Sequence, residues 1–334
     1  MSNHKLGQNR RVVGCALILL GLSALGVLLG AALGSTGFDP LLHVGQDPLA
    51  LHIVWNIRLP RTLGALLAGA LLGLSGALAQ GLFRNPLADP YLLGSASGAS
   101  LGVTSALVFF GVSPMATDVL MRLGLTGAAF LGAVGAVLLT LMLAQGVQHT
   151  LRLLLAGVIV GVVLGAFSSL VMLMVPDVLF AMQAFLLGST GYVGWSAVGL
   201  MACVYGPCLA VSAAFGRVLD ALTLGETTAR SLGFRLVPLR ALLIAVLALS
   251  VGTAVAQTGL IAFVGLVSPH LVRALVKTTH GGLVVLSSLM GGVLLMMADL
   301  LARSVVAPAE LPVGVLTAVL GGVYLLWLMH EKRH

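Results

Sequence analysis

Long apolar runs separated by short polar segments make up most of this 334-residue chain. Several runs approach or exceed the roughly 18 apolar residues that mark a membrane-spanning helix. The pattern predicts an all-α polytopic membrane protein with about ten transmembrane helices in one domain, residues 1–334. The predicted spans are Val12–Leu33, Thr62–Leu82, Leu92–Phe110, Leu123–Ala144, Leu153–Val175, Trp195–Phe215, Ala241–Ala256, the short piece Gly259–Val267, Leu283–Ala302 and Val313–Met329.

The stretch between Arg240 and Arg273 predicts a broken helix. Both of these basic positions belong on one side of the membrane, so Ala241–Val272 must cross it and return. At ~1.5 Å per residue these 32 residues reach about 48 Å, less than two crossings of a core roughly 30 Å thick. The second leg, which contains Gly259 and Pro269, must therefore be short. Such a helix survives at membrane depth only if it is enclosed by protein or lines a cavity, which indicates a pathway.

The basic residues predict how the spans are oriented. Only 8% of the residues are charged, against about 25% in soluble domains, so the net charge of +7 reports topology rather than nucleic-acid binding. With the N-terminus inside, 13 of the 17 Lys and Arg residues fall inside, and Arg58, Arg61, Arg122 and Arg303 fall outside. This bias predicts that both termini are cytoplasmic. The first apolar run spans 22 residues, longer than the 7–15 of a signal-peptide core, and is predicted to be retained.

A polar segment, residues 217–240, interrupts the apolar pattern. It contains Arg217, Asp220, Glu226, Arg230, Arg235 and Arg240, six of the 27 charged residues in the chain. Leu224-Gly225 breaks the preceding helix, Glu226–Leu232 has the pattern of two helical turns, and Gly233 stands where a helix C-cap is favoured. Glu226 and Arg230 are spaced to pair at i,i+4. The segment is predicted to be a docking element for a partner; the alternative is a plain connecting loop.

Two neighbouring arginines, Arg58 and Arg61, lie on the side of the membrane opposite to the termini. Arg58 and Arg61 lie three residues apart before the second span, and Asp299 and Arg303 have i,i+4 spacing at the end of a later one. Arginines there are either interfacial side chains or a basic patch for a carboxylate-bearing partner. Small-xxx-small spacings, such as Gly69/Gly73, favour close helix packing in a moving conduit or in an ordinary bundle.

The chemistry that the sequence lacks narrows the function. No Gly-rich phosphate-binding loop with Lys is present, so the chain has no nucleotide site of its own. The eight histidines fall near predicted span ends or in loops, and the three cysteines have no metal-ligand spacing. Asp299 is the one candidate for a buried titratable residue that an ion-coupled carrier would need. A conduit without an energy source needs an external one. The alternatives are a secondary transporter and an intramembrane enzyme.

Six motifs in order along residues 55–325 resemble the permease subunits of ABC importers for iron chelates and cobalamin, the FecCD/BtuC-like family. They are Ile57–Arg61 (IRLPR), Arg84–Gly94 (RNPLADPYLLG), Arg152–Gly157 (RLLLAG), Leu224–Gly233 (LGETTARSLG), Phe263–His270 (FVGLVSPH) and Glu310–Gly314 (ELPVG). The resemblance implies the type II, large-permease fold in a bacterial inner membrane. It also implies a second copy of the chain, two cytoplasmic ATPase subunits that use ATP and Mg, and a periplasmic binding protein.

The resemblance also implies roles for particular residues. Arg58, Arg61 and Arg303 match the periplasmic rim on which the binding protein docks. The residues that match the ATPase-coupling segment are Asp220, Leu224, Gly225, Glu226, Ala229, Arg230, Leu232 and Gly233. The cytoplasmic gate corresponds to Asn85, Leu87, His149 and Thr150, although the loop before Arg152 departs from the Ser/Thr-rich pattern of the vitamin B12 permease. No catalytic residue, metal site or bound cofactor is expected in this chain.

The substrate is predicted on weaker chemistry. A pathway lined by aliphatic residues suits haem, a flat apolar macrocycle, with ferric siderophores and cobalamin as the alternatives. Met172, Met174 and Met182 are either soft substrate contacts or plain packing.

Overall fold

The computed structural model describes residues 2–34, 37–38, 48–110, 119–144 and 150–331, and they are almost entirely helical. The helices are α1 (Ser2–Ala32), α3 (Pro48–Ile53), η1 (Val54–Arg58), α4 (Leu59–Phe83), η2 (Pro90–Leu93), α5 (Ser95–Phe110), α6 (Val119–Leu143), α7 (Thr150–Met174), α8 (Pro176–Leu187), α9 (Trp195–Ala214), α10 (Gly216–Thr223), α11 (Glu226–Ser231), α12 (Leu236–Thr258), α13 (Val264–Leu275), α14 (His280–Ser304) and α15 (Val313–Glu331). Two two-residue strands, β1 (Leu33–Gly34) and β2 (Gly37–Phe38), pair antiparallel after α1.

The helices confirm the predicted class. Within the described residues, seven helical stretches are long and apolar enough to cross a membrane, and α5, α8, α13 and α15 are shorter apolar helices. The predicted break after Ala256 is present, because α12 ends at Thr258 and the next helix is only 12 residues long. Its bounds differ from the prediction: the short helix is Val264–Leu275 rather than Gly259–Val267. Pro269 lies inside it and does not end it.

Two further helical segments were not predicted. Residues 176–187, assigned to a connection, form α8, in which Pro176 occupies a first-turn position that suits proline. The second span was predicted to begin at Thr62, yet residues 48–83 form one continuous helical stretch. Within it, Leu59 donates its backbone N–H to Val54, five residues back. Pro60 explains this π-turn, because proline has no N–H and its ring clashes with the carbonyl four residues earlier.

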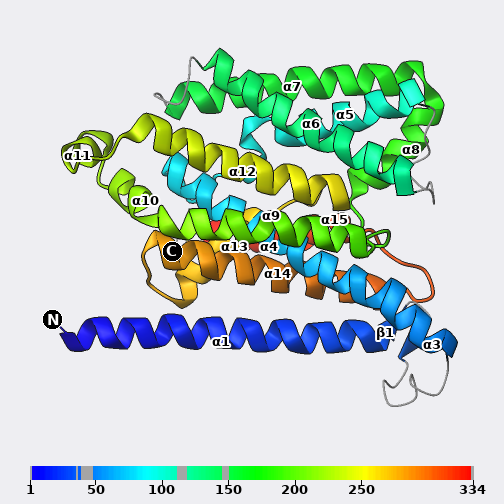
Figure 1. The fold of residues 1–334 in the computed structure, drawn as a ribbon, viewed down its shortest axis with the longest axis horizontal. Coiled ribbons are helices and arrows are strands. Elements are labelled where there is room, and N and C mark those ends of the chain that lie inside the picture. The colour runs from blue at the N-terminus through cyan, green and yellow to red at the C-terminus, as the bar shows by residue number, and fades with distance from the viewer. Residues whose placement is uncertain (1, 35–36, 39–47, 111–118, 145–149, 332–334) are drawn as a thin grey trace.

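The bundle is layered around α4, α12 and α14 (Figure 1). These three spans are mostly buried, whereas α1, α6, α7 and α9 are mostly exposed, as expected of helices that face lipid. In Figure 1, α1 lies along one edge beside α14, and α5, α6 and α7 lie along the other edge. The start of α1 and the end of α15 lie toward the end of the bundle that carries α11. We call this the α11 end and the opposite end, where α4 begins, the Arg61 end.

Glycines set the spacing of the central pair of helices. A Cβ added at Gly69 would lie 2.2 Å from the carbonyl oxygen of Gly291, and one at Gly73 would lie 2.2 Å from that of Ser287. The α4 and α14 backbones are therefore in direct contact, which only glycine permits. The Gly69/Gly73 spacing confirms the predicted close packing. Gly98 makes the same kind of contact between α5 and α6, opposite Gly132.

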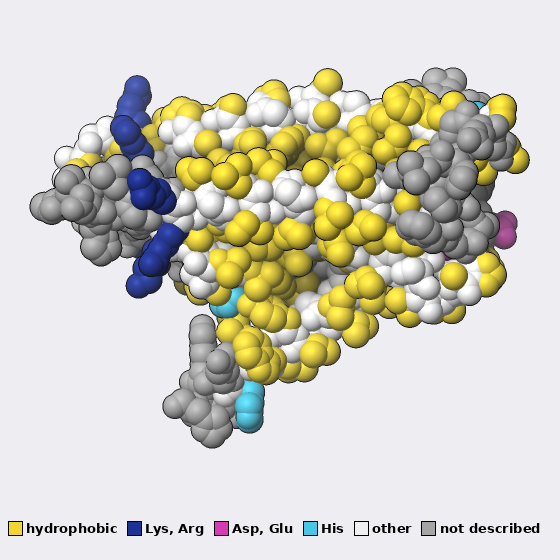
Figure 2. All heavy atoms as spheres, turned by 90° about the horizontal axis from the view of Figure 1, so that it is seen from below, with side chains coloured by type: hydrophobic (Ala, Val, Ile, Leu, Met, Phe, Trp, Pro, Cys, Tyr) yellow, Lys and Arg dark blue, Asp and Glu magenta, His cyan; other side chains and the backbone are white. Residues whose placement is uncertain are grey.

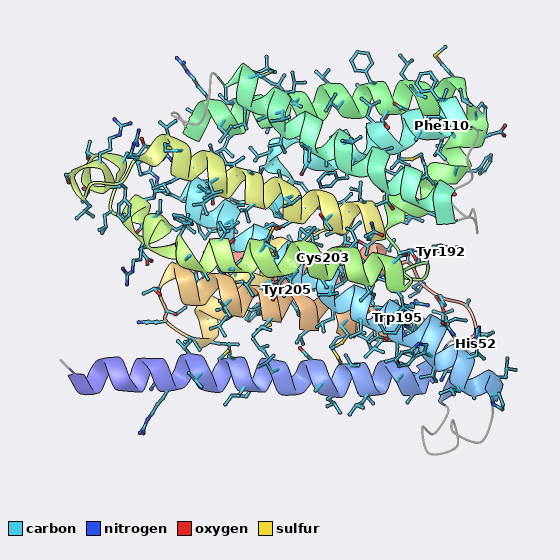
Figure 3. The ribbon with its side chains drawn as sticks, in the orientation of Figure 1. His52, Phe110, Tyr192, Trp195, Cys203 and Tyr205 are labelled. Carbon is cyan, nitrogen blue, oxygen red and sulfur yellow. The ribbon has the colours of Figure 1, made fainter. Side chains whose placement is uncertain are left out.

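The surface has the pattern of a membrane protein. Figure 2 shows a broad hydrophobic band across the middle of one face, with Lys and Arg side chains gathered toward the α11 end. At the Arg61 end, the rings of Trp55 and Trp195 lie 5.4 Å apart, and Trp195 Nε1 donates a hydrogen bond to the Trp55 carbonyl. Figure 3 places Trp195 and Tyr192 together at this end. Such aromatic side chains favour the boundary between lipid and water.

Candidate functional site

The short helix α11 is a capped element at one extremity of the bundle (Figure 1). Phe234 donates its backbone N–H to the Ala229 carbonyl, and Gly233 donates to the Arg230 carbonyl. This pair of bonds is a Schellman motif, and Gly233 has the positive φ of 88° that it requires. The helix and its glycine cap follow the sequence prediction. Ala229 is fully buried, so the helix rests on the bundle through this residue.

A partly buried ion pair fixes α11 to α12. Arg240 Nη2 lies 2.6 Å from Glu226 Oε1, whereas the predicted i,i+4 partner, Arg230, lies 4.0 Å from the Glu226 carboxylate. Partial burial raises the pKa of Glu226, but the hydrogen bond and charge of Arg240, with the charges of Arg84 and Arg230, outweigh it and leave the pKa below its ordinary value. The pair that anchors this helix is therefore Glu226–Arg240, with Arg240 almost completely buried.

Asp220 connects the same region to α14. Its Oδ1 lies 2.7 Å from the His280 Nδ1 and accepts the His280 backbone N–H at 3.0 Å. A carboxylate at this position satisfies an N–H of the first helical turn and favours the helix dipole. The exposed surface of this region includes Leu224, Leu232 and the Arg230 side chain, together with the polar residues Thr227, Thr228 and Arg235. It is a mixed surface of leucines, hydroxyl groups and positive charge.

The predicted gate residues lie next to this region. Arg84 ends α4 with a left-handed φ of 50°, and the Asn85 side chain accepts a hydrogen bond from the Leu87 N–H. Leu87 is exposed, and Asn85 is also at the surface. His149 lies outside the described residues. Thr150 begins α7, and its side chain is also outside the description.

At the Arg61 end, two arginines and two carboxylates form a charge-balanced network in which every member but Glu310 is buried. Arg61 donates from Nε and Nη2 to Asp299 Oδ1 at 3.2 and 3.1 Å, and from Nη1 to both Glu310 oxygens at 3.0 and 2.8 Å. Arg303 donates from Nε to Asp299 Oδ2 at 2.9 Å and from Nη2 to Thr62 Oγ1 at 3.1 Å. Thr190 completes the shell by donating to Asp299 Oδ1. The network joins α4, α14 and the loops before α9 and α15.

Arg58 is also engaged within the chain. Its Nη1 donates to the carbonyls of Ala31 and Ala32, at 3.3 and 3.1 Å. These are among the last carbonyls of α1, which have no partner in the helix, so Arg58 caps that helix. The three arginines predicted to form the docking rim, Arg58, Arg61 and Arg303, are all at least nine-tenths buried, and their role in docking stays a prediction. Intramolecular acceptors account for the burial.

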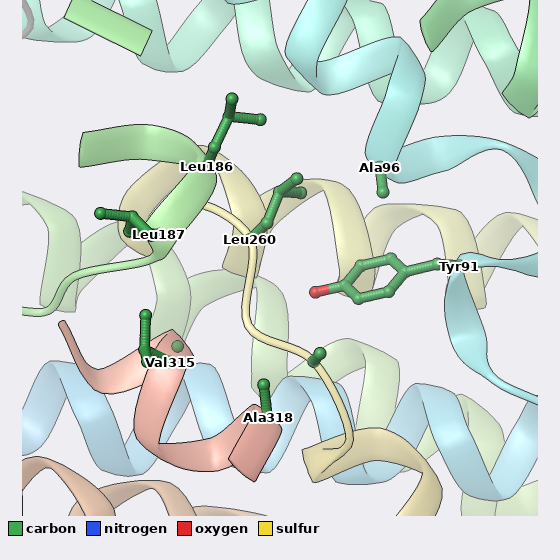
Figure 4. A pocket seen from close by; sticks show the side chains of 9 residues that line it. Tyr91, Ala96, Leu186, Leu187, Leu260, Val315 and Ala318 are labelled. Carbon is green, nitrogen blue, oxygen red and sulfur yellow. The ribbon is translucent and has the colours of Figure 1, made fainter. Parts of the chain in front are cut away.

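Figure 4 shows an apolar cavity within the described part of the chain. Its volume is about 280 Å3, and its walls come from η2, α5, α8, residues 259–263 and α15. Among its described lining residues Tyr91 is the one with a polar side chain, beside aliphatic ones such as Leu186, Leu260 and Val315. The chemistry of this wall offers shape and little else. Such a wall offers few hydrogen-bond partners to a ligand.

The three methionines fit packing better than substrate contact. Met182 is fully buried in the main apolar cluster, and Met172 packs against that cluster. Met174 is exposed at the end of α7. None of the three lines the cavity. Among the described residues, no group of three His, Cys, Asp or Glu side chains could hold a metal ion.

Sequence reasoning missed Glu310 and Thr190 as partners in the arginine network. The Asp299–Arg303 contact is signalled by its i,i+4 spacing. Arg61 and Glu310 are 249 residues apart, and nothing local connects them. Tyr91 was identified only as part of a motif. A tyrosine hydroxyl in apolar surroundings usually has a hydrogen-bond partner, and this could have drawn attention to it.

The comparisons with known proteins agree with this geometry. Residues 16–331 match the model of the FecCD transport family. The chain is 39% identical over 330 residues to the hemin transport system permease protein HmuU of Yersinia pestis, covering 98% of this chain and 97% of that one. It is 38% identical over 332 residues to the vitamin B12 import system permease protein BtuC of Escherichia coli O9:H4, covering 98% of each.

A solved structure is similar over the same length. It is a metal-chelate type ABC transporter in an inward-facing conformation, with a TM-score of 0.83 and 31% sequence identity. The match covers 97% of this chain and 99% of that one.

Proposed function

We propose how this chain works from one premise: it belongs to the FecCD transport family and is a membrane permease subunit of an ABC importer. Two copies would form the pathway, two ATPase subunits would bind at the α11 end and a binding protein would deliver substrate at the Arg61 end. ATP and Mg would be used by the ATPase, since this chain has no phosphate-binding loop. The positive-inside rule supports placing the α11 end, with both termini, in the cytoplasm.

The observation that carries this proposal is the anchoring of α11. The helix exposes Leu224, Arg230 and Leu232, yet Glu226 ties it to Arg240 at the start of α12. The other end of α12 leads directly into the cavity wall at residues 259–263. A push on α11 by a closing ATPase would therefore reach the cavity along one helix. The coupling role covers Asp220, Leu224, Gly225, Glu226, Ala229, Arg230, Leu232 and Gly233, with Asn85 and Leu87 as the adjoining gate.

For the substrate we favour haem, with a ferric siderophore and cobalamin as alternatives. The apolar wall around Tyr91 and Leu260 supports a flat, apolar macrocycle. The relatives named above are described as hemin and vitamin B12 permeases. Absorption spectra of the loaded binding protein would distinguish the three, because haem, ferric siderophores and cobalamin absorb at different wavelengths.

We propose that the binding protein docks by exchange of ion-pair partners: one of its carboxylates replaces Glu310 as the partner of Arg61. Glu310 binds Arg61 through both oxygens, and about a third of its side chain is exposed. A carboxylate of the partner can take its place on Arg61 without leaving a buried charge unpaired. Arg58 and Arg303 would then contribute by holding α1, α4 and α14 in register around that site.

We expect replacement of Glu310 by Gln to tighten docking of the binding protein about three- to tenfold. The substitution removes the carboxylate that competes for Arg61, and one partly exposed ion pair contributes about 1 kcal/mol. Titration of the purified binding protein onto the reconstituted permease, at low and high salt, measures the effect. The gain should shrink at high salt because the new pair is partly exposed.

The matched control is Asp177→Asn, which removes one negative charge from an exposed site at the same end (Figure 1). Asp177 has no ion pair among the described residues. Equal tightening in both variants would mean that net charge alone acts, and the exchange at Arg61 would be abandoned.

Replacement of Glu226 by Ala is expected to reduce transport about tenfold, since a charge-assisted hydrogen bond contributes about 1.5–3 kcal/mol and 1.4 kcal/mol is a factor of ten. Arg240 would lose its closest carboxylate, and α11 would no longer be held to α12. ATP hydrolysis and transport are measured in the same liposomes. Docking of the binding protein should stay unchanged. Arg230→Ala, which removes the exposed side chain 4.0 Å from Glu226 and keeps the 2.6 Å Glu226–Arg240 contact, serves as the comparison. An E226A protein with normal coupling would remove the anchor from the mechanism.

The first test of the proposed function is purification of the protein from its native membrane in detergent, with identification of what accompanies it. An ATPase at about equal stoichiometry, and uptake that requires ATP, are expected. A chain that purifies alone and transports on an ion gradient would instead be a secondary transporter. Asp299 argues against that alternative, because it is enclosed by Arg61, Arg303 and Thr190 and does not line the cavity.

A further inference from the structure

One hydrogen bond crosses from the gate segment to the wall of the cavity. Tyr91 Oη donates to the Ile261 carbonyl at 3.0 Å, joining residues 170 apart in sequence. Tyr91 lies in η2, directly after the segment that carries Asn85 and Leu87. Ile261 lies in residues 259–263, which we call the link because they connect α12 to α13. Figure 4 shows the hydroxyl of Tyr91 directed toward the link.

The link has an unusual backbone. Gly259 has a φ of 70°, and Phe263, which precedes α13, has a φ of 68°. A positive φ is unfavourable for a bulky aromatic residue, so the surrounding structure must hold Phe263 in place. Its side chain packs against Gly321 of α15, where a Cβ would come within 2.4 Å. The link is therefore a segment kept in a strained conformation at the wall of the cavity.

Besides the apolar packing of Leu260 and Ile261, two hydrogen bonds from other elements hold the link in this conformation. Leu260 donates its N–H to the Phe185 carbonyl at the end of α8, and the Ile261 carbonyl accepts from Tyr91. The Tyr91 contact comes from the gate segment, and its position there is fixed. The Asp89 side chain accepts the Tyr91 N–H at 2.8 Å, and the ring packs against both large apolar clusters.

We propose that Tyr91 is a positioning residue for transport: its hydroxyl holds the link as a cavity wall and makes the wall and the gate segment move together. The inference rests on the proposed function, because it assigns a role within that transport cycle. With the bond intact, a displacement of Asn85 and Leu87 carries Tyr91 and pulls on Ile261. Without it, the gate and the wall move separately, and ATP is hydrolysed without substrate passing.

The test is Tyr91→Phe, which keeps the ring in the clusters and removes only the hydroxyl. Tyr205→Phe is the matched control, since Tyr205 Oη accepts a hydrogen bond from Ser288 at 2.8 Å between two regular helices, α9 and α14. Figure 3 places Tyr205 in the middle of the bundle. Two quantities are measured on the complex with its ATPase: hydrogen exchange of the link, and substrate transported per ATP hydrolysed.

In Tyr91→Phe we expect exchange at the link to rise about fivefold, the scale of one lost hydrogen bond, and transport per ATP to fall by a similar factor. Both should be unchanged in Tyr205→Phe. Exchange that rises while transport per ATP stays normal would overturn the proposal, as would unchanged exchange. The exchange measurement needs no transport, so failure of this inference is distinguishable from failure of the proposed function.

Discussion

Replacement of Asp299 by Ala is expected to destabilise the folded protein by about 3–5 kcal/mol, the cost of removing one partner from a buried ion pair. Asp299 is fully buried and accepts hydrogen bonds from Arg61, Arg303 and Thr190. Without it, Arg303 would keep only the Thr62 hydroxyl as a polar partner within the network. Thermal unfolding in detergent, followed by the loss of the monodisperse species, measures the change.

A double-variant comparison separates the charge from the cavity that truncation leaves. Asp299→Ala with Arg303→Ala should lose less stability than the two single variants added together, because residues that share a contact are not additive. Asp177→Ala, at an exposed site, should unfold as the unaltered protein does. A mild effect of Asp299→Ala, no larger than that of Asp177→Ala, would mean that the arginines find other acceptors.

Helix class, the broken span and the α11 cap could all be predicted because each depends on local sequence. The length of an apolar run identifies a membrane span. The chain between Arg240 and Arg273 is too short for two full crossings, so one of its two helices must be short. Gly225 and Gly233 bracket α11 by their backbone preferences. These signals need no knowledge of distant residues.

The burial of the arginines could not be predicted in the same way. Charge patterning places Arg58 and Arg61 at a membrane boundary, but it does not say what they bind. Their partners, the end of α1 and Glu310, come from parts of the chain at least 26 residues away. A buried arginine and an exposed one have the same local sequence, and only the fold distinguishes them. The helix α8 was missed for a related reason, since a helix of 12 residues is too short to be read as a span.

The two ends of the bundle are connected through single helices. α14 carries His280, bound to Asp220, at the α11 end and the Asp299–Arg303 pair at the Arg61 end. Its 25 residues extend about 37 Å at ~1.5 Å per residue. Because α14 also touches α4 backbone to backbone, neither helix can slide past the other without separating. Close packing along this pair is therefore the feature on which the geometry of both ends depends.

Replacement of Gly291 by Ala is accordingly expected to destabilise the protein by about 1–3 kcal/mol, the usual cost of overpacking a well-packed site. The new Cβ would lie 2.3 Å from the Gly69 carbonyl oxygen and 2.9 Å from the Gly73 Cα. Both are backbone atoms that no rotamer change can move, so α4 and α14 must separate. The same thermal unfolding measurement applies, and transport should fall with stability, since the network of Asp299 lies further along the same helix.

The control for that variant is Gly135→Ala in α6, where an added Cβ meets nothing within 4 Å. Alanine is favoured over glycine in a helix by about 1 kcal/mol, so this variant should be neutral or slightly more stable. The two substitutions are chemically identical and differ in what the methyl group meets. Opposite signs are therefore expected from the same change. If Gly291→Ala were also neutral, α4 and α14 would lie further apart than the described backbone positions, and the two ends of the bundle would not be connected through that contact.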